Sequence, residues 1–171
     1  MEVFFSTSAL IVSLISLLIS IWLWRESNRP VVSVRIRTHK GGNVGIVYNI
    51  EMVNSGARPA RNVRLLATRT ELERALAMEA RKTSDFENEF ELVMRCFEPR
   101  AVVPILLNGE TVSNSFGHTS KVSPFWKPGA IIQLRIEYEG MEGQSYNSKA
   151  ALKIDDTAGF AGSFYGSSEE R

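Results

Sequence analysis

The chain is poor in the side chains from which most metal sites and thiol-based active sites are built. It has one cysteine, Cys96, and two histidines, His39 and His118, among 171 residues. A single cysteine excludes the internal disulfide framework of small secreted domains and leaves no second thiol at a metal-binding spacing. We interpret Cys96 as an ordinary buried hydrophobic residue and place both histidines in surface turns or loops. The sequence therefore predicts no metal and no other cofactor.

Motifs of catalysis are missing as well. The chain has no phosphate-binding loop, nucleophile elbow or dinucleotide-binding glycine motif. Asp155 and Asp156 are adjacent and would point to opposite faces of a strand, so they cannot act as a cooperating acid–base pair. We therefore expect a protein that is not an enzyme and has no small-molecule substrate.

An excess of charge of one sign is also lacking. The formal net charge is +1, and the basic residues between positions 58 and 69 are balanced by an acidic stretch that follows them. Nucleic-acid-binding domains normally carry a strongly basic face. We therefore expect no nucleic-acid partner.

What the chain does have is one long apolar segment near its N-terminus. Residues 3–24 carry no charge, and at about 1.5 Å per residue a helix of this length crosses the ~30 Å hydrocarbon core of a membrane. The basic flank and small-residue cleavage site of a signal peptide are missing. We predict a transmembrane anchor over residues 1–26, with a buried or interfacial helix of a larger assembly as the alternative. The residues predicted at the membrane interface are Trp22, Trp24, Arg25 and Arg29.

The basic residues around this segment predict its orientation. Five of them follow it closely, at positions 25, 29, 35, 37 and 40, and only the α-amino group precedes it. Positively charged flanks tend to remain in the cytoplasm. We therefore predict a single-pass protein of the inner membrane, with its N-terminus outside and the remainder of the chain in the cytoplasm.

Small residues recur on one side of the predicted anchor. Ser6, Ser13 and Ser20 are seven residues apart, and Ala9 and Ser16 lie close to the same face. Because this spacing favours the close approach of a second helix, we expect these residues to pack against another copy or a partner's helix. Two alternatives remain: each hydroxyl bonds to a carbonyl one turn earlier in its own helix, or the hydroxyls line a pore.

Beyond residue 30, apolar and polar residues alternate as they do in half-buried strands, most clearly from Ile132 to Tyr138. Turn residues separate these stretches, and the pair Asn108–Gly109 is typical of a tight hairpin. We expect seven strands, the second of them central, near residues 31–38, 44–53, after 62, 101–107, 110–117, 132–139 and 146–154.

This pattern predicts a mainly β fold, because no regular crossover helices separate the strands. A single N-terminal transmembrane helix would be followed by a seven-stranded immunoglobulin-like antiparallel β-sandwich with one inserted helix. The sandwich would occupy residues 27–156. Residues 157–171 are rich in glycine and serine and would form a flexible tail.

One stretch within the predicted sandwich has a recognisable pattern. It consists of Asn54, Gly56, Pro59, Ala60, Asn62 and Val63, at the end of one strand and the beginning of the next. This pattern resembles the strand–turn–strand of bacterial immunoglobulin-like modules such as the cell-adhesion-related, CARDB-like domains. The resemblance implies an interaction or scaffolding module, although such relatives are usually extracellular.

The inserted helix is predicted between Thr68 and Lys82, where the strand alternation stops. Thr68 and Glu71 form a possible capping box, and apolar residues recur at helical spacing after it. The next stretch, residues 83–100, is acidic in its first half and alternates like a strand in its second half. The acidic part is most often a solvated loop, with the binding of a basic partner as the alternative. The residues predicted to bind a partner are Glu71, Glu73, Asp85, Phe86, Glu87, Glu89 and Phe90.

These observations favour a bitopic membrane protein whose cytosolic sandwich holds a protein partner at the bilayer, through a sheet edge or residues 69–91. The first alternative is a self-assembling membrane effector of the defence or toxin type, with the sandwich as its sensor. The second alternative is an extracytoplasmic adhesion or carbohydrate-binding module.

Overall fold

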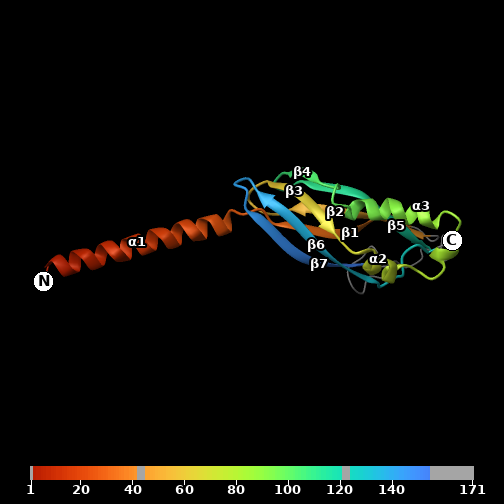
Figure 1. The fold of residues 1–171 in the computed structure, drawn as a ribbon, viewed down its shortest axis with the longest axis horizontal. Helices are drawn as coiled ribbons and strands as arrows, with labels where there is room; N and C mark the ends of the chain where they lie inside the picture. The colour runs from red at the N-terminus through yellow and green to blue at the C-terminus, as the bar shows by residue number, and fades with distance from the viewer. Residues whose placement is uncertain (1, 42–44, 121–123, 155–171) are drawn as a thin grey trace, which may run out of the picture.

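The structure is a computed structural model that describes residues 2–41, 45–120 and 124–154, with the backbone alone for residues 2–9 and 39–41. A long helix, α1 (Glu2–Ser27), leads into a β-rich body of two antiparallel sheets (Figure 1). The predicted mainly β fold with one N-terminal apolar helix is confirmed. The tail predicted at residues 157–171 lies outside the described residues.

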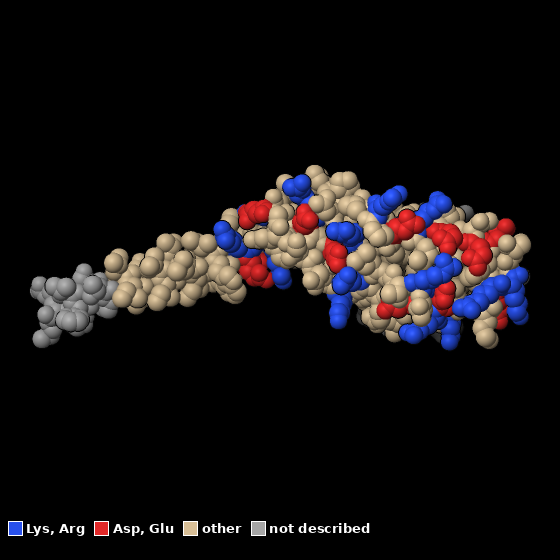
Figure 2. Space-filling view, viewed as in Figure 1, with Lys and Arg blue, Asp and Glu red and all other residues tan. Residues whose placement is uncertain are grey.

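Helix α1 is apolar on all sides rather than along one stripe. All of its side chains from Leu10 to Ser27 are exposed, and Figure 2 shows charged side chains in this part of the helix only near the body. Its window Leu10–Ser27 has a mean hydropathy of 1.6, so the helix is long and apolar enough to cross a membrane. The helix ends at Ser27, because Asn28 donates from its side chain and backbone to the Trp24 carbonyl and Pro30 cannot continue the helix.

The body is a sandwich of a three-stranded and a four-stranded sheet. The first sheet has the order β1 (Val32–Gly41), β2 (Gly45–Asn54), β5 (Thr111–Ser120). The second has the order β4 (Val103–Leu106), β3 (Ala60–Leu66), β6 (Ile131–Gly140), β7 (Ser145–Lys153). All pairings are antiparallel. The seven predicted strands and the central place of the second are confirmed, although β1 extends into the turn predicted at residues 39–43.

The core lies between the two sheets, where alternate residues of each strand are buried. In β6 these are Ile132, Leu134, Ile136 and Tyr138, which is the predicted set. A cluster of aromatic rings closes one end of this core. Phe116 stacks on Trp126 with ring centres 4.9 Å apart, and the indole N–H of Trp126 donates to the Phe116 carbonyl.

The predicted hairpin at Asn108–Gly109 is wrong. Its two strands belong to different sheets, since β4 pairs with β3 and β5 pairs with β2. Gly109 does take the positive φ of 74° that the dipeptide favours, and its N–H donates to the Asn54 carbonyl at 2.8 Å. The Asn–Gly pair therefore predicted the position of the turn correctly. Which sheet each flanking strand joins depends on the strands that it pairs with.

The insertion contains more helix than predicted. It has two α-helices and two 3₁₀ turns: α2 (Arg69–Ala75), η1 (Ala80–Lys82), α3 (Phe86–Met94) and η2 (Arg95–Phe97). The capping box of Thr68 and Glu71 is present. Helix α2 stops before the predicted end at residue 82, because Leu76 pairs with Trp126 and the Ala75 carbonyl accepts from Lys127.

The strand predicted in the second half of residues 83–100 is wrong, since α3 occupies this region. Phe90 and Val93 are buried and Leu92 is 58% exposed, which is helical rather than alternating spacing. The Phe86 and Phe90 rings, one turn apart, stack with centres 5.7 Å apart. The alternation of apolar residues from Phe90 onward does not indicate a strand here. Apolar residues one helical turn apart decide which face of α3 is buried.

Candidate functional site

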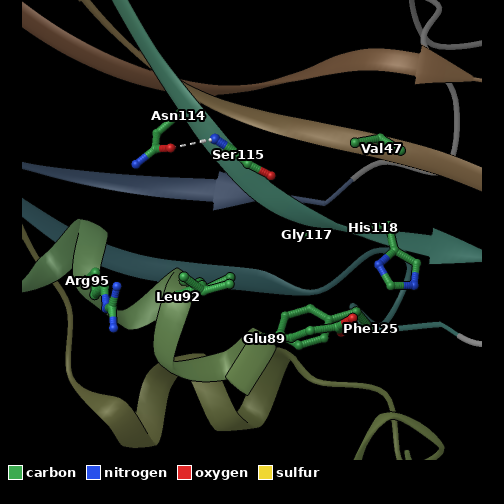
Figure 3. A pocket seen from close by; sticks show the side chains of 10 residues that line it. Val47, Glu89, Leu92, Arg95, Asn114, Ser115, Gly117, His118 and Phe125 are labelled. Carbon is green, nitrogen blue, oxygen red and sulfur yellow. Dashed lines mark hydrogen bonds between the residues drawn. The ribbon is translucent and has the colours of Figure 1, made fainter. Parts of the chain in front are cut away.

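A groove lies between α3 and the edge strand β5, at the end of the sandwich far from α1 (Figures 1 and 3). It has a volume of about 450 Å³ and is open to solvent. Glu89, Leu92 and Arg95 line it from the helical side. The strands and the loop after β5 supply Val47, Asn114, Ser115, Gly117, His118 and Phe125. We call this feature the α3–β5 groove.

The floor of the α3–β5 groove is rigid because it continues into the core. Phe125 meets Trp126 edge to face with ring centres 4.9 Å apart, and both residues are buried. The Trp126 backbone N–H donates to the His118 carbonyl at 3.1 Å. On the other side, Phe90 and Val93 hold α3 against the body. A partner would therefore meet a preformed surface, which lowers the entropy cost of binding.

The walls of the groove combine apolar and polar side chains. Leu92 is 58% exposed and Val47 is 39% exposed. Both side chains could therefore bury apolar surface against a partner. Glu89 and Arg95 add one charge of each sign. The strand β5 lies at the edge of its sheet, where an extended peptide can add a further strand, but the carbonyls of Phe116 and His118 already accept from Trp126.

Several of the predicted partner-binding residues make contacts within the body, and their binding of a partner stays a prediction. Phe90 is completely buried, and Glu71 caps α2 by accepting from the backbone and the hydroxyl of Thr68. These hydrogen bonds lower the pKa of the Glu71 carboxyl, and the bond from the Thr68 backbone N–H has the largest effect. Asp85 and Phe86 begin α3, with Asp85 exposed and Phe86 partly buried.

An ion-pair network accounts for two of the remaining predicted residues. Arg69 contacts Glu73 and Glu91 at 2.9 Å and Glu87 at 3.6 Å, and its guanidinium lies 4.9 Å from the centre of the Phe90 ring. The hydrogen bonds that Arg69 donates, first to Glu73 and then to Glu91, raise the pKa of its guanidinium. The network joins α2 to α3. Of the seven predicted residues, only Glu89 lines the groove.

Sequence reasoning missed the other groove residues. Val47, Phe125 and the pair Leu92 and Arg95 stand in three separate segments, and no local pattern links these segments. His118 was predicted in a loop but belongs to β5, where it is partly buried and stacks on Phe125 with ring centres 6.2 Å apart. The structure does not describe the side chain of His39. Cys96 is only partly buried; Asn114 donates to its sulfur at 3.3 Å, and burial raises the pKa of the thiol.

The residues that resemble an immunoglobulin-like module form a second, structural centre. Asn54 is completely buried, and its Oδ1 accepts from the N–H groups of Val31 (3.2 Å) and Gly56 (3.0 Å). Its Nδ2 donates to the carbonyls of Arg58 (2.8 Å) and Leu106 (3.0 Å). Asn54 thus joins the segment after α1 to β4. This role is structural, and the resemblance itself stays a prediction.

The predicted membrane-interface residues lie where α1 meets the body. Trp22 and Trp24 are exposed to 63% and 54%, and Arg29 pairs with Glu26 at 3.1 Å. Arg25 lies in the last turn of the helix. A residue that the sequence did not single out, Arg58, places its guanidinium 4.9 Å from the centre of the Trp24 indole.

The serine face of α1 is only partly described. Ser13, Ser16 and Ser20 are exposed, and the Ser20 hydroxyl donates to the Ser16 carbonyl at 2.8 Å. This hydrogen bond to a carbonyl one turn earlier is the alternative predicted for the serines, in place of packing against a second helix. Ser6 and Ala9 belong to α1, but their side chains lie outside the described part. Packing of this face against another helix stays a prediction.

A protein family matches nearly the whole chain. Its description is "Domain of unknown function (DUF8453)", and it matches residues 3–158. The chain belongs to the DUF8453 family. The match includes α1 from its second residue and the complete sandwich, so the apolar helix and the β-rich body are parts of one family unit. No curated protein and no solved structure matches the chain.

Proposed function

We propose that this DUF8453 protein is a single-pass protein of the inner membrane that holds a protein partner at the bilayer. The helix α1 would be the anchor, with the N-terminus outside and the sandwich in the cytoplasm. Arginines at positions 25, 29, 35 and 37 all follow the apolar segment, and this bias supports the orientation.

The α3–β5 groove is the observation that carries the proposed binding function. It combines a preformed apolar floor, exposed Leu92 and Val47, and the edge of a sheet. An extended peptide segment fits this combination, because its backbone can pair with β5 while its apolar side chains enter the groove. A basic residue in the segment could pair with Glu89. The groove lies far from α1, so a partner could reach it without meeting the bilayer (Figure 1).

Nothing in this proposal requires a reaction. Among the described residues, no group of three or more His, Cys, Asp or Glu side chains is arranged to hold a metal ion. We propose recognition rather than catalysis because the groove offers contact area beside the edge strand β5.

The experiment is a pull-down with the full-length chain in mild detergent, read by mass spectrometry and complex size. We expect a stoichiometric partner that Leu92→Asp removes, because a carboxylate would be buried against apolar partner groups. Ile131→Asp is the matched control, since Ile131 is 57% exposed and does not line the groove. A partner that both variants retain, or that both lose, would refute binding at the groove.

The same experiment addresses the alternative function. A complex that contains only copies of this chain would support the self-assembling membrane effector. The serine face of α1 would then be the surface to mutate, with Ser13→Leu and Ser20→Leu together expected to abolish assembly.

A further inference from the structure

The connection between α1 and the sandwich is short and tightly held. Only residues 28–31 separate the helix from β1, and at about 3.5 Å per residue they reach no more than roughly 14 Å. Val31 is hydrogen-bonded through its N–H to Asn54 and through its carbonyl to the N–H of Ser55. Pro30 is buried, and its carbonyl accepts from the Tyr138 hydroxyl at 3.4 Å. The sandwich therefore has to begin close to the end of the anchor.

Arg58 sets the depth of this end of the sandwich. Its guanidinium lies 4.9 Å from the centre of the Trp24 ring, which is within the range of a cation–π contact. Interfacial tryptophans lie at the level of the lipid headgroups. A side chain stacked on Trp24 has to occupy the same layer, so Arg58 would lie among the lipid phosphates. It would do so although it follows Trp24 by 34 residues in the sequence.

Two further turns reach the same end of the molecule. The turn between β6 and β7 is joined to Arg58 through Glu142 at 2.6 Å, and it presents Met141, which is 50% exposed. The turn between β4 and β5 is joined to Asn54 through Gly109, and it presents Leu107, which is 53% exposed. The apolar tip Met141 thus lies beside the cation Arg58, a combination that suits the boundary between headgroups and water, whereas the Leu107 N–H donates to the Glu110 carboxylate at 2.7 Å.

The charges at this end leave donors for a phosphate. Glu26 pairs with Arg29 and Glu142 pairs with Arg58. Arginine carries five N–H donors in a fixed fork, so each guanidinium can bind a phosphate oxygen in addition to its carboxylate. The cleft among these residues holds only about 20 Å³, which is too small for a soluble ligand of that kind to enter. A phosphate would therefore contact these arginines from outside the cleft, as a lipid headgroup can.

We propose that this end of the sandwich is a second membrane-binding surface, in which Arg58 binds phospholipid phosphates and the tips Met141 and Leu107 touch the headgroup layer. The proposal rests on the membrane anchoring proposed above, but not on the binding of a partner at the groove. It makes the sandwich a body held upright on the bilayer, with the α3–β5 groove directed away from it.

Fluorescence quenching in vesicles tests this proposal with the full-length chain. In a Cys96→Ala background, a fluorophore is attached at Met141→Cys or, as the control, at Met78→Cys. Met78 is 81% exposed and follows α2, a helix that lies toward the end of the body away from α1 (Figure 1). The vesicles contain phosphatidylcholine, phosphatidylglycerol and a lipid with a spin label on its headgroup. We expect the probe at position 141 to be quenched several-fold more strongly than the probe at 78.

A second substitution tests the role of Arg58. Arg58→Gln should reduce the quenching at position 141 toward that at 78, whereas Arg81→Gln, which removes the same charge from η1, should leave it unchanged. Equal quenching of the two probes, or no effect of Arg58→Gln, overturns the proposal. A probe at 141 that responds only when a protein partner is added overturns it in favour of a protein contact. Co-flotation of each variant with the vesicles reports anchoring separately, and a chain that does not float overturns both proposals.

Discussion

A buried asparagine holds together segments of this protein that are far apart in the sequence. The Asn54 side chain makes four hydrogen bonds, two as acceptor and two as donor, which satisfies its capacity for donation completely. Gly56 is required beside it, because a Cβ there would lie 2.5 Å from the Arg29 carbonyl oxygen and against the Val31 nitrogen. The resemblance to immunoglobulin-like modules therefore rests on residues that build a corner of the sandwich.

Replacement of this asparagine should be severely destabilising. Asn54→Ala would leave two buried N–H groups and two carbonyls without their partner, and we expect the free energy of unfolding to fall by about 3 kcal/mol or more. Thermal and denaturant unfolding of the full-length chain in detergent, followed by circular dichroism and by tryptophan fluorescence, of which buried Trp126 gives the part sensitive to unfolding of the body, would measure this. Asn147→Ala, at an exposed position of β7, is the control and should stay within about 0.5 kcal/mol of wild type. Similar losses in both variants would contradict the structural role of Asn54.

At the level of elements, α3 carries both the misread segment and the proposed binding surface. Its inner face holds the helix to the body through Phe90 and Val93, and its outer face presents Leu92 to the groove. In a strand, Phe90 and Leu92 would point to the same side. In a helix they lie on different sides, so the two residues can have separate roles.

This difference gives a test of the helix that needs no partner. We expect Phe90→Ala to cost about 3–5 kcal/mol, because it removes a fully buried ring, and Leu92→Ala to cost less than about 0.5 kcal/mol. Denaturant unfolding of the two variants in parallel gives both values. Comparable losses would indicate that both side chains share a buried face, as in the strand that the sequence pattern suggested.

For the whole molecule, the arrangement of anchor, sandwich and groove determines what a partner can reach. Helix α1 leaves one end of the body and the α3–β5 groove lies toward the other (Figure 1). With α1 in a bilayer, the groove would be held above the surface at a fixed distance. An elongated body of this kind can present a binding site to other proteins without bringing them into contact with lipid.

Reporter fusions test the orientation of the whole chain. A fluorescent protein fused after Arg171 should be fluorescent, and an alkaline phosphatase fused at the same place should be inactive, because the basic flank keeps this side in the cytoplasm. Expression levels of the two fusions, measured by immunoblot, serve as the control. An active phosphatase with a dark fluorescent protein would refute the cytosolic orientation and support the extracytoplasmic adhesion or carbohydrate-binding alternative.

Local patterns in the sequence were sufficient for the secondary structure wherever one interaction dominated. The apolar run of α1 and the alternation in β6 predicted their elements correctly, because burial along one face, or the lack of any charge, follows directly from residue order. The capping box at Thr68 was likewise readable, since both of its hydrogen bonds lie within four residues. In residues 83–100 two periodicities fitted equally well, and the choice between them depended on the core.

Only the tertiary structure decided how these elements meet. The Asn108–Gly109 turn connects two sheets rather than two paired strands, because the partners of β4 and β5 come from elsewhere in the chain. The groove joins residues from β2, α3, η2 and β5, and Arg58 reaches Trp24 across 34 positions. The sequence by itself determined an apolar helix and a β-sandwich, since periodicity records which faces avoid water. Sites made by residues distant in sequence carry no periodic signal, so folding was needed to bring them together.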